Sequence, residues 1–280
     1  MKRLLLVICV LGMGSLARAQ TAPSLGSAAT FAVLGSSNVT CTAPGVISGD
    51  VGVSAGVFTN TTGCLVVGTV HQGDQAAINA EAALKTAYAN ALVANNNCTS
   101  SLAAAYTGTA ASFTLGPGVY CNNLDAGLTF TNTTLTLDAG GNANAVWVFI
   151  ISGAGGLTGT SLQVVMANGG QPCNVYWLVG FDSTLTTSTF QGNILGGGAA
   201  SAFTSTSGTL IGRVLANGAV TMTGPNVHGT CALVAQGGGS CPADDDDKHH
   251  KDKDKDRDHD KDKDKDKDKD KDKDNNKDDN

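Results

Sequence analysis

Thr131-Asn132-Thr133-Thr134 is the first of five short threonine-rich segments that recur between residues 128 and 229. Each segment begins with Thr, ends with Thr, Ser or Asn, and leads into an apolar run. The other four are Thr158-Gly159-Thr160-Ser161, Thr186-Thr187-Ser188-Thr189, Thr206-Ser207-Gly208-Thr209 and Thr223-Gly224-Pro225-Asn226. They start roughly 17 to 28 residues apart, a spacing within the range of solenoid repeats. The repeats therefore predict a stack of β coils with the threonines on one flat face.

Two kinds of strand pattern accompany these segments. Leu128 and Phe130 alternate with threonines, which is the period-two pattern of a strand with one apolar face. Residues 145–151 and 175–179 are instead apolar at every position, which indicates strands that are covered on both sides. The interior of the coil covers one side, so the other side needs a separate element.

Residues 74–94 are predicted to supply that element. Asp74 can cap a helix, and the Ala-rich run 75–94 contains neither Gly nor Pro. Leu84, Tyr88 and Leu92 recur every four residues and give the helix an apolar side. A helix of about 20 residues spans about 30 Å, close to the height of about six stacked coils.

The predicted fold is mainly β, a right-handed parallel β-helix (solenoid) with one long α-helix packed along one face. Residues 25–70 are short strands broken by Gly, Ser, Asn and Pro. We expect them to form an opening coil and a compact N-terminal cap region, because an open terminal coil exposes an unpaired strand edge.

Both ends of the chain differ from this body. Lys2 and Arg3 precede an apolar run and a small-residue cleavage signal, so residues 1–19 are predicted to be a secretory signal peptide cleaved before Gln20. Residues 244–280 alternate Lys and Asp with almost no apolar residue, which predicts a disordered tail. The body is then a single domain, 20–243, of a secreted, extracellular protein that is expected to be a monomer.

The body contains very few charges. Its acids are Asp50, Asp74, Glu81, Asp125, Asp138 and Asp182, and its bases are Lys85 and Arg213. Nucleic acid is therefore excluded as a partner, because nothing could neutralise its phosphates. No later run is long enough to insert in a membrane, and we expect no metal site and no cofactor. Arg213 is expected to bridge coils through backbone carbonyls.

The body also contains seven cysteines, and an exported protein can form disulfides. The expected pairs are Cys41–Cys64, Cys98–Cys121 and Cys231–Cys241, with Cys173 buried and free. Spacing alone does not fix this connectivity.

The threonine face is the candidate functional surface. Threonine offers a hydroxyl and a methyl group on a side chain whose β-branch restricts χ1, so an ordered array of threonines can order water. The candidate residues are Thr131, Thr134, Thr158, Thr160, Ser161, Thr186, Thr189, Thr206, Thr209, Thr223 and Asn226.

Two other functions remain open from these residues. Threonine is common in strands, so the face could be only scaffold in an extracellular structural or adhesion module. A carbohydrate-active enzyme needs clustered carboxylates or bases, and the few acids of this body are scattered. The protein is therefore expected not to be an enzyme.

Residues 25–229 resemble the microbial ice-binding (antifreeze) proteins that have a discontinuous β-solenoid and a long flanking helix. The matching segments are Leu25–Leu34, Ile47–Gly52, Gly116–Tyr120, Cys173–Gly180, Gly192–Leu195, Gly212–Ala216 and Gly218–Thr221. The resemblance implies coils that stack out of sequence order and a face that adsorbs to the ice crystal surface, which inhibits ice growth or recrystallisation. The family's ice-face pattern is Thr, Ala or Gly, any residue, then Thr or Asn. Thr223–Asn226 fits this pattern, and the other four segments depart from it.

Overall fold

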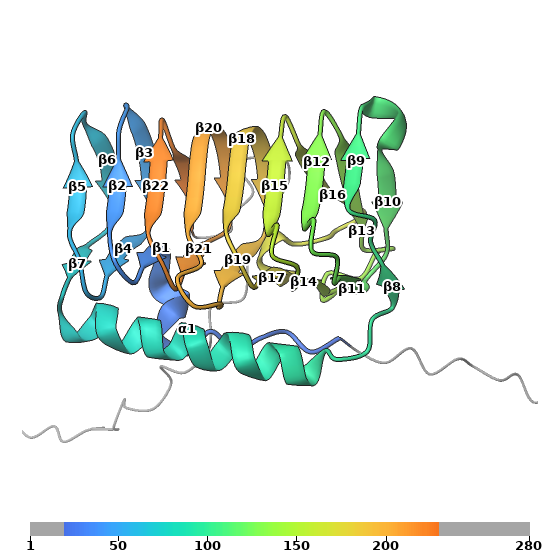
Figure 1. The fold of residues 1–280 in the computed structure, drawn as a ribbon, viewed down its shortest axis with the longest axis horizontal. Coiled ribbons are helices and arrows are strands. Elements are labelled where there is room, and N and C mark those ends of the chain that lie inside the picture. The colour runs from blue at the N-terminus through green and yellow to red at the C-terminus, as the bar shows by residue number, and fades with distance from the viewer. Residues whose placement is uncertain (1–19, 230–280) are drawn as a thin grey trace, which may run out of the picture. The chain divides into compact units, whose positions relative to one another are not determined.

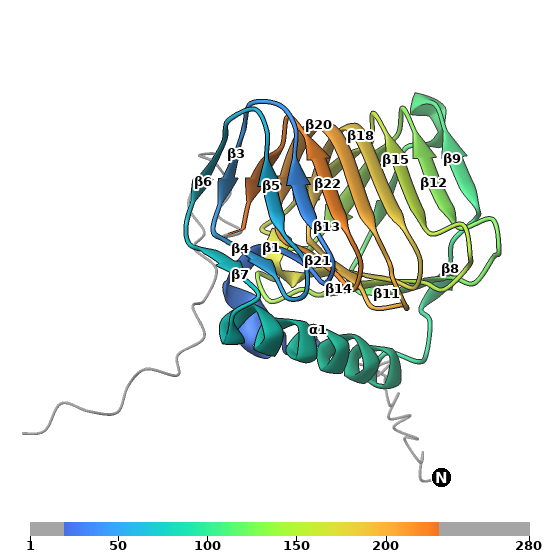
Figure 2. The same ribbon diagram turned by 60° about the vertical axis from the view of Figure 1, so that its left-hand side comes forward.

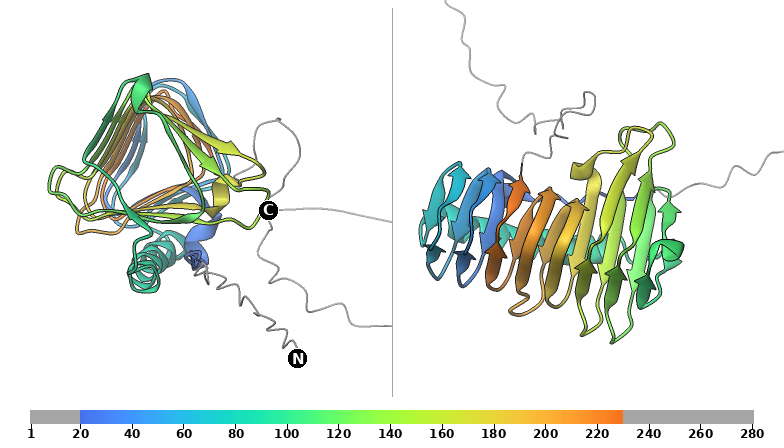
Figure 3. Two further views of the ribbon diagram at one scale, coloured as in Figure 1. Left: turned by 90° about the vertical axis from the view of Figure 1, so that its right-hand side faces the viewer. Right: turned by 90° about the horizontal axis from the view of Figure 1, so that it is seen from above.

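The computed structural model describes residues 20–229, which form one β-helix with a triangular cross-section and a single long helix outside it (Figure 1, Figure 3). This confirms the predicted parallel β-helix with a flanking α-helix. The predicted signal peptide, the predicted Lys/Asp tail and the expected Cys231–Cys241 pair lie outside the described residues.

One side of the triangle, the helix face, is a nine-stranded parallel sheet. Its strands in spatial order are β7 (Val70–Gln72), β4 (Asp50–Val53), β1 (Phe31–Gly35), β21 (Val214–Ala216), β19 (Asn193–Gly196), β17 (Val175–Val179), β14 (Trp147–Ile151), β11 (Gly118–Asn122) and β8 (Ser100–Ser101).

The other two sides share the long strands β18 (Ser183–Gln191) and β20 (Phe203–Ile211), which turn the corner between them. The threonine face consists of β5 (Phe58–Asn60), β2 (Val39–Cys41), β22 (Val220–Thr223), the first halves of β20 and β18, β15 (Leu157–Thr160), β12 (Leu128–Thr131) and β9 (Ala105–Thr107). The third face consists of β6 (Cys64–Val67), β3 (Gly45–Ser48), β23 (Asn226–His228), the second halves of β20 and β18, β16 (Gln163–Ala167), β13 (Thr134–Asp138) and β10 (Phe113–Leu115).

The coils do not stack in chain order. β1 to β6 make two coils, the chain then passes through α1 (Gln75–Ala94), and β8 to β23 make the remaining coils from the far end back. The last coil pairs with the first: β21 with β1, β22 with β2 and β23 with β3. Figure 1 shows this as orange β22 lying beside blue β2.

The expected N-terminal cap is not a separate structure. β4, β5 and β6 form a second regular coil that pairs with the first along all three faces. The sequence suggested a cap because these strands are short and broken by Gly and Ser. The same short strands and small residues serve equally well at the corners of a coil.

Large apolar side chains fill the inside of the coils. Phe149 and Trp177 stack with ring centroids 3.9 Å apart, and Phe190 continues the column. Tyr106 and Phe113 stack at the terminal coil formed by β9 and β10, where η2 (Thr109–Ala111) also lies. Burial of these rings stabilises the stack and leaves the alternate strand positions to face outward.

α1 lies along the helix face (Figure 2). A second apolar cluster holds it there. Ala80, Leu84, Ala87 and Ala91 are buried against outward residues of the strands and against η1 (Gly26–Thr30). The small alanines allow a close approach of helix and sheet. A Cβ on Gly197 would lie 2.0 Å from Cγ of Tyr88, so a glycine there leaves room for the tyrosine ring.

The two ends of α1 are fastened by polar and covalent contacts. The Asp74 carboxylate accepts a hydrogen bond from the Ala77 amide at 2.9 Å, as the sequence predicted for a helix cap. Glu81 accepts a hydrogen bond from Ser54 in β4's loop and pairs with Lys85. Beyond the C-terminal end, Cys98 is bonded to Cys121 of β11.

The disulfides agree with the expectation except at Cys173. Cys41–Cys64 and Cys98–Cys121 are both formed. Cys173, which was expected to be free, is disulfide-bonded. It lies in η3 (Pro172–Asn174), immediately before β17. Spacing could not reveal this, because residues far apart in the chain become neighbours in a stack of coils.

Most corners between the threonine face and the third face contain a residue with positive φ. This residue comes directly after the second outward-facing residue of the strand on the threonine face. The φ values are between 49° and 55° at Asn132, Ser161, Thr187 and Ser207, and 61° at Gly224. The next side chain points inward, and the hydroxyls of Thr133 and Ser188 donate to backbone carbonyls there. These corners set the point at which each strand leaves the threonine face.

Thr187 is the β-branched member of this group and is strained by its left-handed backbone. Replacing Thr187 with Asn, the residue at the equivalent corner position 132, should raise the free energy of unfolding by about 1 kcal/mol. Chemical denaturation measures this change. Thr186→Asn, on the adjacent strand position, is the control and should give no gain; equal gains at both positions would contradict the corner geometry.

Stability should also depend on the ionisation of Asp74. The hydrogen bond from the Ala77 amide, and then that from His71, holds the pKa of the Asp74 carboxyl below its ordinary value. A depressed folded pKa means that the stabilisation is present above the unfolded pKa and is lost as pH falls through the folded value. Thermal unfolding followed by circular dichroism at a series of pH values should show this loss at acid pH. Asp74→Asn, which still caps the helix but does not ionise, should lack that part of the pH dependence.

Candidate functional site

A two-column array of threonines covers the threonine face from one end of the described coils to the other. Seven of its eight strands carry Thr-X-Thr, counting the residue after β2 and the residue after β5. The threonines are Thr129 and Thr131, Thr158 and Thr160, Thr184 and Thr186, Thr204 and Thr206, Thr221 and Thr223, Thr40 and Thr42, and Thr59 and Thr61. The eighth strand, β9, has Ala105 and Thr107.

Strand register aligns these residues into columns. Thr129 pairs with Thr158, Thr158 with Thr184 and Thr184 with Thr204, and the second threonines of the same strands pair in the same way. The columns continue through β22 to β2 and β5. Because the two threonines of each strand are separated by one residue, both face outward.

The residue between each pair of threonines points into the coil. Phe130, Gly159, Leu185 and Met222 occupy this position and are buried. Gly159 has little space to spare, since a Cβ there would lie 2.9 Å from Cδ2 of Leu185. Packing of this inner row therefore holds the outer threonines in place.

The face is uncharged and its hydroxyls are largely unused within the protein. All of its threonines are half-buried or exposed. Among the described residues, only Thr42, Thr61 and Thr223 of this array make side-chain hydrogen bonds, including one of 2.9 Å between Oγ1 of Thr42 and Oγ1 of Thr223. None of the eight strands carries a charged residue on this face. The remaining hydroxyls can bond water.

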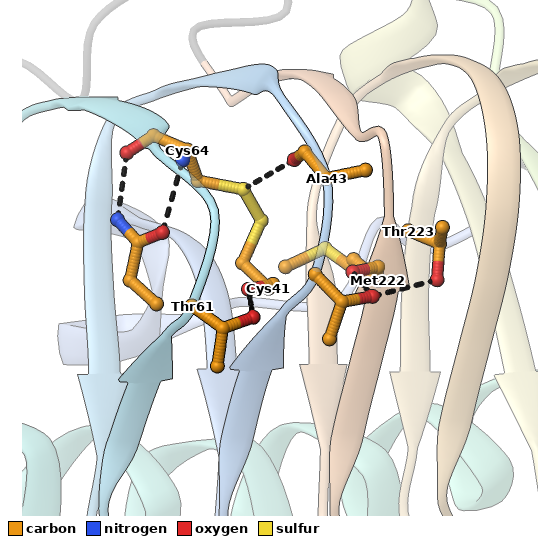
Figure 4. Close-up of a disulfide and its surroundings, with 8 residues drawn as sticks. Cys41, Ala43, Thr61, Cys64, Met222 and Thr223 are labelled. Atoms are coloured by element: carbon orange, nitrogen blue, oxygen red, sulfur yellow. Dashed lines mark hydrogen bonds between the residues drawn. A yellow bond between two sulfur atoms is a disulfide. The ribbon is translucent and has the colours of Figure 1, made fainter.

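A disulfide lies behind the array at one end. Cys41 is the inward residue of β2 and is bonded to Cys64, at the start of β6 (Figure 4). Thr61 donates to the Cys41 carbonyl at 3.4 Å, and Cys64 Sγ lies 3.3 Å from the Ala43 carbonyl oxygen. The bond joins the two N-terminal coils directly beneath their threonines.

The predicted site residues divide between two faces. Thr131, Thr158, Thr160, Thr186, Thr206 and Thr223 lie in the threonine array. The expectation that the fourth residue of each segment shares this face is wrong. Thr134, Thr189, Thr209 and Asn226 lie on the third face, and Ser161 is a corner residue with positive φ. A four-residue segment crosses the corner, so its two ends face different sides.

Nine members of the array were not among the predicted residues: Thr40, Thr42, Thr59, Thr61, Thr107, Thr129, Thr184, Thr204 and Thr221. The sequence signal that could have found most of them is Thr-X-Thr, the period-two spacing of one strand face. The residues in β2 and β5 also required knowledge that the N-terminal coils pair with the last one.

The third face has no comparable order. One column on this face consists of Thr134, Gln163, Thr189, Thr209, Asn226, Val46 and, at the end, the exposed Leu65. Among residues 20–229, no three His, Cys, Asp or Glu side chains are arranged to hold a metal ion. Within the same range, no helix is long and apolar enough to cross a membrane.

Proteins similar in sequence to this chain are described as ice-binding proteins. The family model described as ice-binding-like matches residues 33–228. An ice-binding protein of Nostoc sp. (strain HG1) is 39% identical over 224 residues, covering 77% of this chain and 77% of that protein. An ice-binding protein of Flavobacterium frigoris (strain PS1) is 30% identical over 212 residues, covering 71% and 73%.

Solved structures give the same result. The crystal structure of an ice-binding protein from the Antarctic ascomycete Antarctomyces psychrotrophicus is similar with a TM-score of 0.61 and 29% sequence identity, over 74% of this chain and 98% of that chain. The family model and the structural similarity both extend over nearly all of the described residues. The chain belongs to the ice-binding-like family.

Proposed function

We propose that this protein is exported and binds ice through its threonine face, and that it thereby inhibits ice growth or recrystallisation. The observation that carries the proposal is the two-column Thr-X-Thr array, which runs in unbroken strand register over the described coils. The similarity to ice-binding proteins supports it.

The array has the geometry of a crystal-like surface. Neighbouring coils lie about 4.8 Å apart, and alternate residues on a strand lie about 6.6–6.8 Å apart. These two repeats are close to repeats in the ice lattice. A side chain whose χ1 is already restricted loses little entropy when it contacts a solid.

The chemistry of the array suits ordered water. Each threonine methyl sits beside a hydroxyl that can anchor a water molecule, and most of these hydroxyls make no hydrogen bond to another of residues 20–229. A charged side chain would impose its own hydration shell on the lattice, and the array contains none. Water held in this arrangement can merge with the growing crystal.

Adsorption explains how so small a surface could affect a macroscopic crystal. Bound protein forces the ice front to advance between the adsorbed molecules, which curves the front and opposes further growth. Residues 1–19, with Lys2 and Arg3 before an apolar run, have the pattern of a signal peptide and support export. An exported protein would meet ice outside the cell.

Bulky substitutions on the threonine face should reduce activity. Thr186→Tyr and Thr206→Tyr each place a ring above the flat array and should lower ice recrystallisation inhibition severalfold, because the surface no longer lies flush with the crystal. Purified protein in a frozen-sample assay, with circular dichroism as the check on folding, measures this effect.

The matched controls are Thr189→Tyr and Thr209→Tyr, three residues later on the same strands but on the third face. They should retain activity. Loss in the controls alone would move the ice site to the third face. A wild-type protein that is folded but inactive in the assay would favour the alternative of an extracellular structural or adhesion module.

Adding the threonine that β9 lacks should improve ice recrystallisation inhibition. Ala105→Thr supplies the one missing threonine, at the β9 end of the first column, and should give a small gain in ice recrystallisation inhibition. Ala105→Val is the control, since it has the same branched shape without the hydroxyl. If valine gives an equal gain, the hydroxyl at that position is not what anchors water.

A further inference from the structure

The threonine array is assembled from two separate parts of the chain. Six coils come from residues after α1, and two come from residues 31–67. They meet at a seam between β22 and β2, where Thr221 pairs with Thr40 although the two are far apart in the chain. Elsewhere each coil follows its neighbour directly, so the short connection between them limits their relative position.

Backbone pairing alone does not determine the register at this seam. A shift of two residues would keep apolar side chains inside and polar ones outside, because the side-chain period of a strand is two. Such a shift would displace one part of each threonine column by the spacing of alternate residues along the strand, about 6.6–6.8 Å. The seam therefore needs side-chain contacts that recognise one register.

Arg213 makes contacts of this kind. It precedes β21 in the last coil, and its Nε donates to the Ala29 carbonyl oxygen, in η1 just before β1, at 2.8 Å. Its Nη1 donates at 3.0 Å to Oδ1 of Asn193, in β19 of the preceding coil. The sequence-based expectation that Arg213 bridges coils through a backbone carbonyl is confirmed.

Asn193 extends the connection. Its amide is fully buried, and Nδ2 donates to the Cys173 and Val175 carbonyl oxygens at 2.9 and 3.2 Å. The hydrogen bonds of Asn193 and Arg213 thus form a polar ladder across four successive coils, from the residues at the start of β17 to Ala29 just before β1. The bond from Arg213 to Ala29 carries it across the seam.

A guanidinium suits this position for a physical reason. Its donors are held in a rigid planar fork, so bonds to two coils at once fix the distance and angle between them. It stays charged, and charge-assisted hydrogen bonds are stronger than neutral ones. A lysine carries the same charge on one ammonium group at the end of a flexible chain, so it cannot hold two coils at a fixed distance and angle.

We propose that Arg213 is a positioning residue that sets the register across the seam and so aligns the threonines of the two N-terminal coils with those of the other six. The expected effect of Arg213 on ice binding rests on the proposed function, whereas its effect on the register across the seam is independent of that function. Arg213 lies at the corner between the third face and the helix face, so it acts on the array only through the strands.

Hydrogen exchange tests the register without ice. The amides of Thr42, Val46 and Val220 bond across the seam to Met222, Pro225 and Asn38. In Arg213→Met and in Arg213→Lys they should exchange about tenfold faster, since the charge-assisted hydrogen bond that crosses the seam to Ala29 is lost. The amides of Ser161 and Thr189, which bond between other coils, should keep their rates.

Ice activity gives the second readout. The assay runs near 0 °C, where a folded variant with somewhat lower overall stability would retain full activity if Arg213 had only a structural role. We expect activity to fall severalfold, and Thr40→Tyr to cost far less in the Arg213→Met background than in wild type, because the N-terminal threonines are already out of line.

A disulfide across the seam should rescue the variant. Ser48 and His228 are paired positions of β3 and β23 on the third face, away from the array. Ser48→Cys with His228→Cys in the Arg213→Met background should restore both slow exchange and activity. Unchanged exchange at the seam amides in Arg213→Met would overturn the proposal. If the seam amides exchange faster in Arg213→Met but the wild-type protein does not bind ice, the role of Arg213 in setting the register is supported and only the proposed function is rejected.

Discussion

Parallel backbone pairing between successive coils organises the whole of this β-helix. It places equivalent residues of every coil in one line, so a two-residue alternation within a strand becomes a pair of columns along the molecule. The same pairing lines up Phe149 and Trp177 inside the coil as it lines up threonines outside. One backbone arrangement thus produces a packed interior and a periodic exterior.

Each face of the triangle uses that periodicity for a different contact. The helix face directs apolar residues such as Leu178 and Leu195 at α1, and the alanines of the helix let it approach closely. The threonine face directs short, stiff, uncharged side chains at water. The third face has mixed side chains in each column, and periodic backbone alone does not make it a regular surface.

The corners and the seam keep these faces apart and aligned. At most corners between the threonine face and the third face a residue with positive φ ends the threonine face after the second outward side chain. At the seam, pairing of β22 with β2 joins segments that the chain itself does not connect. Because the array depends on both, residues that never touch its surface contribute to its order.

Local patterns were enough to predict the parallel β-helix and the helix that begins after Asp74, because periodicity and a capping residue act within one segment of the chain. The pairs Cys41–Cys64 and Cys98–Cys121 were expected as well, although only the folded chain fixes their connectivity. The sequence also pointed to threonine as the candidate functional side chain, and to Thr131, Thr186 and Thr206, which lie in the array. Three features became visible only in the folded chain: Thr134, Thr189 and Thr209 lie on the third face, residues 50–67 form a coil rather than a cap, and Cys173 is disulfide-bonded. Residues three positions apart lie on different faces when the strand turns a corner between them. Stacking of the coils also brings together residues that are distant in the chain. For the same reason the N-terminal threonines join the array only once the first and last coils have paired.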